Sequence, residues 1–233
     1  MTLQASGNFS SSGTVQTTDT LSIDAGIGLE STGELSANQA DLTAGGSTSI
    51  DRFNGGSLQV NAGDAAVADI VTTGSTEVTA VGTVAQSGTL WAGEVTLTGD
   101  SITLDGQINS SSSVTLSANS MTVVGDTAVQ AVTDLVLASR TAPSTGTMTV
   151  STANRRLILG TSGTLSLLAT VDGAGGVLVA SADQALLIGG DIGASEALEM
   201  VDVTSPQLQI GGFGFGANAD SYWYVQQINA RGD

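Results

Sequence analysis

A short element in which apolar and polar residues alternate recurs along almost the whole chain, and this repeat restricts the fold more than any other feature. Clear copies are residues 21–25, 58–62, 95–99 and 114–118. Taking the first apolar residue of each copy as an anchor gives eleven anchors about 20 residues apart. A second, weaker strand pattern follows several anchors, so each period is expected to hold two short strands. The anchors are Leu3, Leu21, Leu42, Leu58, Val78, Val95, Val114, Leu135, Leu157, Val177 and Leu198.

Alternation with a period of two, bounded by Gly, Asn, Asp and Ser, is typical of strands and not of helices. A coil of about 20 residues cannot enclose its own core, but stacked coils pair each strand with its equivalent and align the inward aliphatic side chains. The repeat therefore predicts an all-β parallel β-helix, or β-solenoid, of about eleven coils across residues 1–210. Residues 211–233 are expected to form a separate C-terminal segment.

Three stretches carry a family resemblance: residues 93–97, 100–106 and 113–118. Over about residues 3–210 the chain resembles the repeat region of the filamentous haemagglutinin type of secreted bacterial adhesin. The resemblance implies a right-handed parallel β-helix that is exported to the cell surface as an adhesin or a surface fibre. It also implies an extracellular location and, as one partner, a host or cell-surface ligand.

The residue types that are missing exclude most common enzyme chemistry. The chain has no His and no Cys, and all five of its basic residues are Arg, so His- or Cys-based nucleophiles, imidazole or thiolate metal sites, Schiff-base lysines and P-loops are excluded. A net charge of -17 makes nucleic acids and anionic membranes poor partners. No apolar run approaches the roughly 20 residues of a transmembrane helix. We expect a protein without enzyme activity, cofactor, nucleic-acid partner or membrane insertion.

Two alternatives remain open at this point. Parallel β-helices also bind or cleave polysaccharides, and cleavage needs only a pair of carboxylates, so a polysaccharide-binding or polysaccharide-cleaving β-helix, or a phage fibre segment, is the competing hypothesis. Aspartate outnumbers glutamate 16 to 6, and carboxylates in turns can ligate calcium. Weak calcium binding by scattered aspartates is the corresponding cofactor hypothesis.

The position between the two inward residues of each repeat is expected to face outward. From Leu21 to Val114 this position is polar, but the next three copies place an apolar residue there, which predicts an exposed apolar stripe and lateral self-association. A covering loop or a different strand register is the competing interpretation. The candidates are the three stripe residues, a neighbour on the adjacent strand and a flanking basic pair: Val136, Ile158, Leu178, Leu187, Arg155 and Arg156.

The two ends of the chain give the remaining candidates. Five aromatic residues gather after Ile210, and they predict a cap over the last coil, a subunit contact or, less directly, a carbohydrate-stacking surface. Because the repeat already begins at Leu3, we expect head-to-tail stacking there on another molecule or on a further β-helix of a longer chain. Residues 231–233 spell the integrin tripeptide Arg-Gly-Asp, a match that chance readily produces. The aromatic candidates are Phe213, Phe215, Tyr222, Trp223 and Tyr224.

Overall fold

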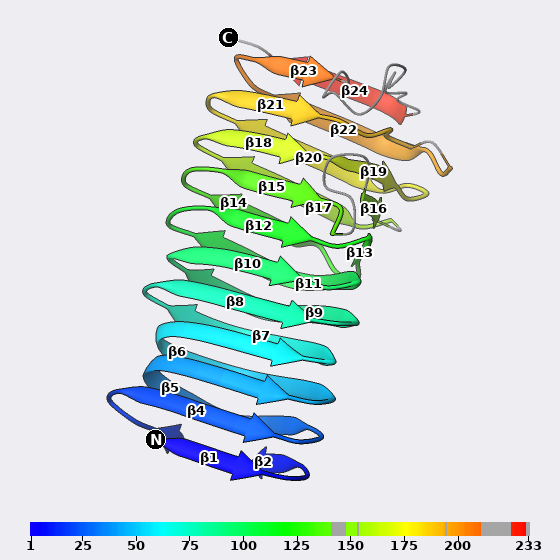
Figure 1. The fold of residues 1–233 in the computed structure, drawn as a ribbon. Coiled ribbons are helices and arrows are strands. Elements are labelled where there is room, and N and C mark those ends of the chain that lie inside the picture. The colour runs from blue at the N-terminus through cyan, green and yellow to red at the C-terminus, as the bar shows by residue number, and fades with distance from the viewer. Residues whose placement is uncertain (141–147, 153, 194, 211–224, 232–233) are drawn as a thin grey trace.

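The computed structural model is a parallel β-solenoid of about ten turns, with β1 at one end of the rod and β24 at the other (Figure 1). It describes residues 1–140, 148–152, 154–193, 195–210 and 225–231. The all-β class and the parallel stacking of coils that the repeat predicted are confirmed. No helix that could span a membrane is found in the described part of the chain.

Strands of successive turns pair in parallel along three separate ladders, so a turn contains three strand segments where the sequence predicted two. In the early turns a single long strand passes through all three ladders: β5 (Leu29–Ala44) pairs with β2, β3 and β4 in turn. The same is true of β6 (Ser47–Ala62), while β7 (Asp64–Thr72), β9 (Thr83–Ala92) and β11 (Ser101–Ser110) each serve two ladders.

Besides these shared strands, each ladder has members of its own. Ladder A contains β1 (Thr2–Ala5), β4 (Thr20–Ala25), β8 (Ser75–Ala80), β10 (Glu94–Thr98), β12 (Val114–Ser117), β15 (Leu135–Ala138), β18 (Thr164–Leu167), β21 (Ala185–Ile188) and β23 (Leu208–Ile210). Ladder B contains β2 (Phe9–Ser11), β13 (Ser120–Val123), β16 (Met148–Ser151) and β19 (Ala169–Asp172). Ladder C contains β3 (Val15–Gln16), β14 (Thr127–Ala131), β17 (Arg156–Thr161), β20 (Val177–Ala182), β22 (Leu198–Thr204) and β24 (Val225–Arg231).

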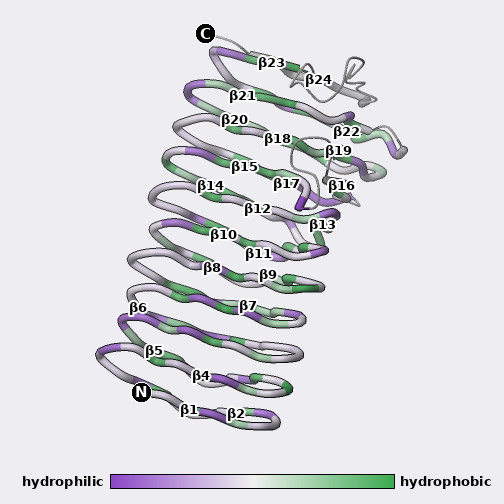
Figure 2. The backbone as a smooth tube through the Cα atoms, in the orientation of Figure 1, coloured by the Kyte–Doolittle hydropathy of each residue, from purple (hydrophilic) through white to green (hydrophobic). Residues whose placement is uncertain are grey.

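The core consists of columns of aliphatic side chains that stack along the rod, one residue from each turn. Apolar and polar residues alternate along the turns (Figure 2), and the apolar ones at inward positions are almost completely buried. Because the inward side chains of each turn pack on those of the next, the turns share one continuous hydrophobic core. One column on ladder C runs Val15, Leu35, Phe53, Ile70, Leu90, Ile108, Val129, Leu159, Ala180 and Val203.

Aspartates at the corners between ladders join successive turns. The Asp64 carboxylate accepts a hydrogen bond from the Thr83 backbone N–H at 2.7 Å, and the Asp134 carboxylate accepts one from the Thr164 N–H at 3.2 Å. In each case the donor lies one turn further along and is the first residue of a strand, β9 for Thr83 and β18 for Thr164. A short carboxylate reaches backbone next to its own position, which explains why these corners use aspartate in preference to glutamate.

One turn in the described part of the chain is much longer than those before it. The hydrogen bond between Asp64 and Thr83 joins residues 19 apart, whereas the equivalent bond between Asp134 and Thr164 joins residues 30 apart. The extra residues lie between the end of β15 and the start of β16. All three ladders nevertheless continue on both sides of them, because β12, β15 and β18 remain paired, as do their counterparts on ladders B and C.

Candidate functional site

The predicted stripe of Val136, Ile158 and Leu178 does not form. Val136 is half-buried on ladder A, where its register partners are Thr115 and Ser166. Leu178 is fully buried on ladder C, in register with Leu157 and Val201. The assignment of Leu178 to the outer surface was wrong because residues 177–180 are apolar throughout, so their alternation gives no indication of which side faces inward.

The long turn is the second reason why the stripe fails. The anchor Leu135 lies on ladder A and pairs with Leu165, but an even spacing of about 20 residues selected Leu157, which lies on ladder C. Residues assigned to one outward row therefore belong to two different ladders. Leu187 lies on ladder A in register with Ser166, so Ser166 separates it from Val136.

Ile158 is half-buried in a different row. Its register partners are Ala128 in the preceding turn and Val179 in the following turn, and both face outward on ladder C. Three apolar residues in register therefore form a short outward row on ladder C. This row shares only Ile158 with the predicted stripe. A role of Ile158 in lateral contact stays a prediction.

The basic pair Arg155 and Arg156 lies at the start of β17 with both side chains exposed. The Arg156 backbone N–H donates to the Asp126 carboxylate at 3.1 Å, so this position fixes a corner between turns.

A third arginine, which sequence reasoning did not single out, has a clear structural role. The Arg140 guanidinium donates from Nη1 to the carbonyl oxygens of Ala80 and Val81, each at 3.0 Å.

The aromatic candidates after Ile210 lie outside the described residues; they are Phe213, Phe215, Tyr222, Trp223 and Tyr224. The described part of that C-terminal segment is β24, which extends ladder C by pairing in parallel with β22. Arg231 ends this strand, while the rest of the Arg-Gly-Asp tripeptide is not described.

For the calcium hypothesis, the relevant observation concerns the grouping of carboxylates. Within the described ranges no three Asp or Glu side chains come together in a group that could hold a metal ion. The acidic residues instead recur singly at corners, as at Asp64 and Asp134. Weak binding by scattered aspartates stays a prediction.

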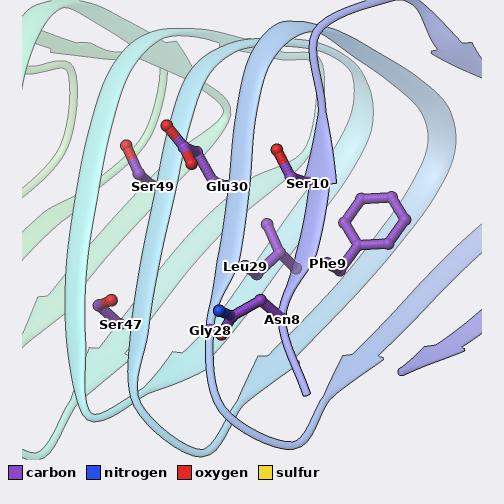
Figure 3. Close-up of a pocket in the computed structure, with 8 residues that line it drawn as sticks. All are labelled: Asn8, Phe9, Ser10, Gly28, Leu29, Glu30, Ser47 and Ser49. Atoms are coloured by element: carbon purple, nitrogen blue, oxygen red, sulfur yellow. The ribbon is translucent and has the colours of Figure 1, made fainter. Parts of the chain in front are cut away.

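The first turn of the rod is less well covered than the turn that follows it. Leu3, Phe9 and Val15 are only partly buried against the core, and each belongs to a strand with a neighbour on one side. A hollow of about 310 Å³ opens beside Phe9 and Leu29 (Figure 3). Ser10, Glu30 and Ser49 form a row across three successive turns along this hollow.

A second feature is an exposed tryptophan on the side of the rod. Trp91 is 56% exposed, and its register partner Val71 is 42% exposed. Hollows of about 250 and 350 Å³ lie on its two sides. Alternation within β9 could have located this residue, because inward Leu90 requires Trp91 to face outward.

No family model, curated protein or solved structure matches the chain. Two surfaces of the molecule stand out, the first turn and the hollows beside Trp91.

Proposed function

We propose that the chain is a non-enzymatic structural rod of an extracellular surface protein or fibre, and that it extends when a further parallel β-coil adds to its first turn. The supporting observation is a difference in burial between the first turn and the next. Leu3, Phe9 and Val15 are partly buried. Their register partners Ile23, Leu29 and Leu35 are 1%, 2% and 0% exposed.

An added coil would complete both kinds of interaction that hold the other turns together. Strands β1, β2 and β3 pair on one side only, so their other side presents backbone donors and acceptors to any approaching strand. Complete burial of an aliphatic or aromatic side chain contributes about 1.5–3 kcal/mol, and each of the three partly buried side chains would gain a share of that. The first turn thus has the chemistry of an interface between coils.

The extracellular and adhesive part of the proposal is supported by the resemblance to the repeats of filamentous haemagglutinin-type adhesins, which use parallel β-helices as surface rods. This is an argument by analogy of fold. The charge of -17 agrees with a rod that stays in solution and avoids anionic surfaces.

The proposal is tested by measuring particle length against protein concentration, using electron microscopy and small-angle X-ray scattering on the purified chain. We expect rods joined end to end, and we expect Phe9→Asp to return them to single rods by placing a charge in the contact. Ser10→Asp is the matched control, because Ser10 is on the same strand but exposed. Single rods at every concentration, or equal effects of the two variants, would overturn the proposal.

A further inference from the structure

The hollows around Trp91 form one groove along the rod. The hollow of about 250 Å³ and the hollow of about 350 Å³ share Trp91 and Ser111 in their linings. The larger one shares Gln130 and Ser162 with a third hollow, also of about 250 Å³. The outward row beneath the groove consists of register partners in successive turns: Val71, Trp91, Asn109, Gln130, Gly160 and Ser181.

The dimensions of the groove suit a long ligand. Strands in a ladder are about 4.8 Å apart, so the row from Val71 to Ser181 spans about 24 Å. At Gly160 the row has no side chain of its own, and the side chains of Gln130 and Ser181 border that position from the two neighbouring turns. An extended polymer could therefore lie along the rod and contact several turns at once.

The groove is uncharged around Trp91 although the chain is strongly acidic. The two hollows beside Trp91 are lined by aliphatic, hydroxyl, amide and glycine residues, and the charged residue Asp183 enters only at the far end of the third. An uncharged lining offers no charge pairing to an ionic ligand. The negative field of a chain with 22 acidic residues also repels polyanions. The electrostatics thus favour a neutral ligand.

The side chains of the groove match the chemistry of a sugar. The face of the Trp91 indole carries partial negative charge, and the C–H groups on the face of a pyranose ring are apolar with slight positive charge, so the two stack. The amides of Asn109 and Gln130 both donate and accept hydrogen bonds, as sugar hydroxyls do. Ser111 and Ser162 add hydroxyl groups on the same side.

We propose that the Trp91 groove binds a neutral polysaccharide, with one sugar ring stacked on Trp91 and the following units hydrogen-bonded to Asn109 and Gln130. A second copy of the rod fits the groove less well. Two rods that lie side by side along the groove would bring charges of -17 together over their whole length, whereas an end-to-end contact joins only one turn of each. The groove lies on the side of the rod, away from the first turn, so glycan binding and end-to-end stacking can succeed or fail separately.

The experiment is affinity electrophoresis of the purified chain in gels that contain a soluble neutral glucan, mannan or galactan, with polyanionic alginate for comparison. We expect at least one neutral polymer to retard the wild-type chain and alginate not to do so. Trp91→Ala should weaken the retardation by roughly tenfold or more, as for removal of a central aromatic contact. Trp91→Phe should retain part of it, because a smaller ring still stacks.

Val81→Ala is the matched control, since Val81 is 75% exposed and absent from the groove lining. Circular dichroism establishes that each variant is folded. The proposal is overturned if no neutral polymer retards the chain, or if Trp91→Ala binds as well as the control. It is also overturned if Trp91→Ala removes lateral self-association instead, since a second copy would then be the occupant.

Discussion

The turns before β16 and the turns after it have the same architecture, but the repeat pattern in the sequence assigns strands to the correct ladder only in the turns before it. Before the long turn, register partners lie about 20 residues apart, and the anchors from Leu21 to Leu135 all lie on ladder A. Beyond it, Leu157, Val177 and Leu198 lie on ladder C. Alternation therefore indicates which side of a strand is buried. The ladder that a strand joins can be inferred from the sequence only where the number of residues per turn stays constant.

The largest effect is expected from a test that places a charge at one buried and at one outward-facing position after the long turn. Leu178→Asp places a charge in the dry core and should unfold the neighbouring turns, with a loss of more than about 4 kcal/mol. Ile158→Asp, on the outer surface, should remain folded with a loss of less than about 1 kcal/mol. Urea denaturation followed by circular dichroism measures both. If Ile158→Asp were the variant that unfolds, the burial described for β17 and β20 would be reversed.

A pair of core truncations compares the packing of the two regions. Leu97 and Leu165 are both fully buried on ladder A, the first before the long turn and the second after it. We expect Leu97→Ala and Leu165→Ala each to cost about 2–5 kcal/mol in unfolding free energy. A much smaller cost at Leu165 would mean that the core is less tightly packed beyond the long turn.

Two corner glycines provide a smaller perturbation. A Cβ atom at Gly55 would meet the Ala37 carbonyl oxygen of the preceding turn, and one at Gly163 would meet that of Thr133. Alanine at either position should cost about 1–3 kcal/mol, because the turns must move apart. Gly13→Ala is the control, since a Cβ there has no atom within 4 Å. Thermal melting of all three distinguishes the clash from a general loss of flexibility.

The smallest expected effect concerns the corner carboxylates. Asp64→Ala and Asp134→Ala each remove the acceptor of one backbone N–H in the next turn and should cost about 0.5–1 kcal/mol, since water can replace the lost partner. Asparagine retains a side-chain oxygen, so Asp64→Asn and Asp134→Asn should be closer to wild type. Equal losses for Ala and Asn would show that the negative charge matters and the hydrogen bond does not.

The sequence predicted the strands and their parallel stacking because both follow from local alternation and an approximate period. It did not predict three strand segments in each turn. In β5 and β6 the chain passes from one ladder to the next without leaving the strand, so glycines such as Gly33 and Gly55 mark bends inside a continuous strand and not its end. The polar residues Ser31 and Thr48 also occupy buried positions on ladder B, which weakens the apolar pattern there.

The interaction surfaces were harder to predict than the fold. Prediction of the stripe required the register of three successive turns. The long turn and the apolar run at residues 177–180 prevented that register from being inferred from the sequence. Trp91 was accessible to the same reasoning, because its neighbours Leu90 and Ala92 are buried. A groove, however, depends on which side chains of other turns lie beside it, and that requires the register of every ladder.

The placement of the extra residues between β15 and β16 has a mechanical consequence. In a solenoid the backbone hydrogen bonds of the ladders run along the axis, so the turns are links in series and a pulling force is limited by the weakest link. A break in even one ladder would create such a link. Here the insertion falls between β15 on ladder A and β16 on ladder B, and ladders A, B and C are all paired across it. The long turn can therefore transmit tension through the same three ladders as its neighbours.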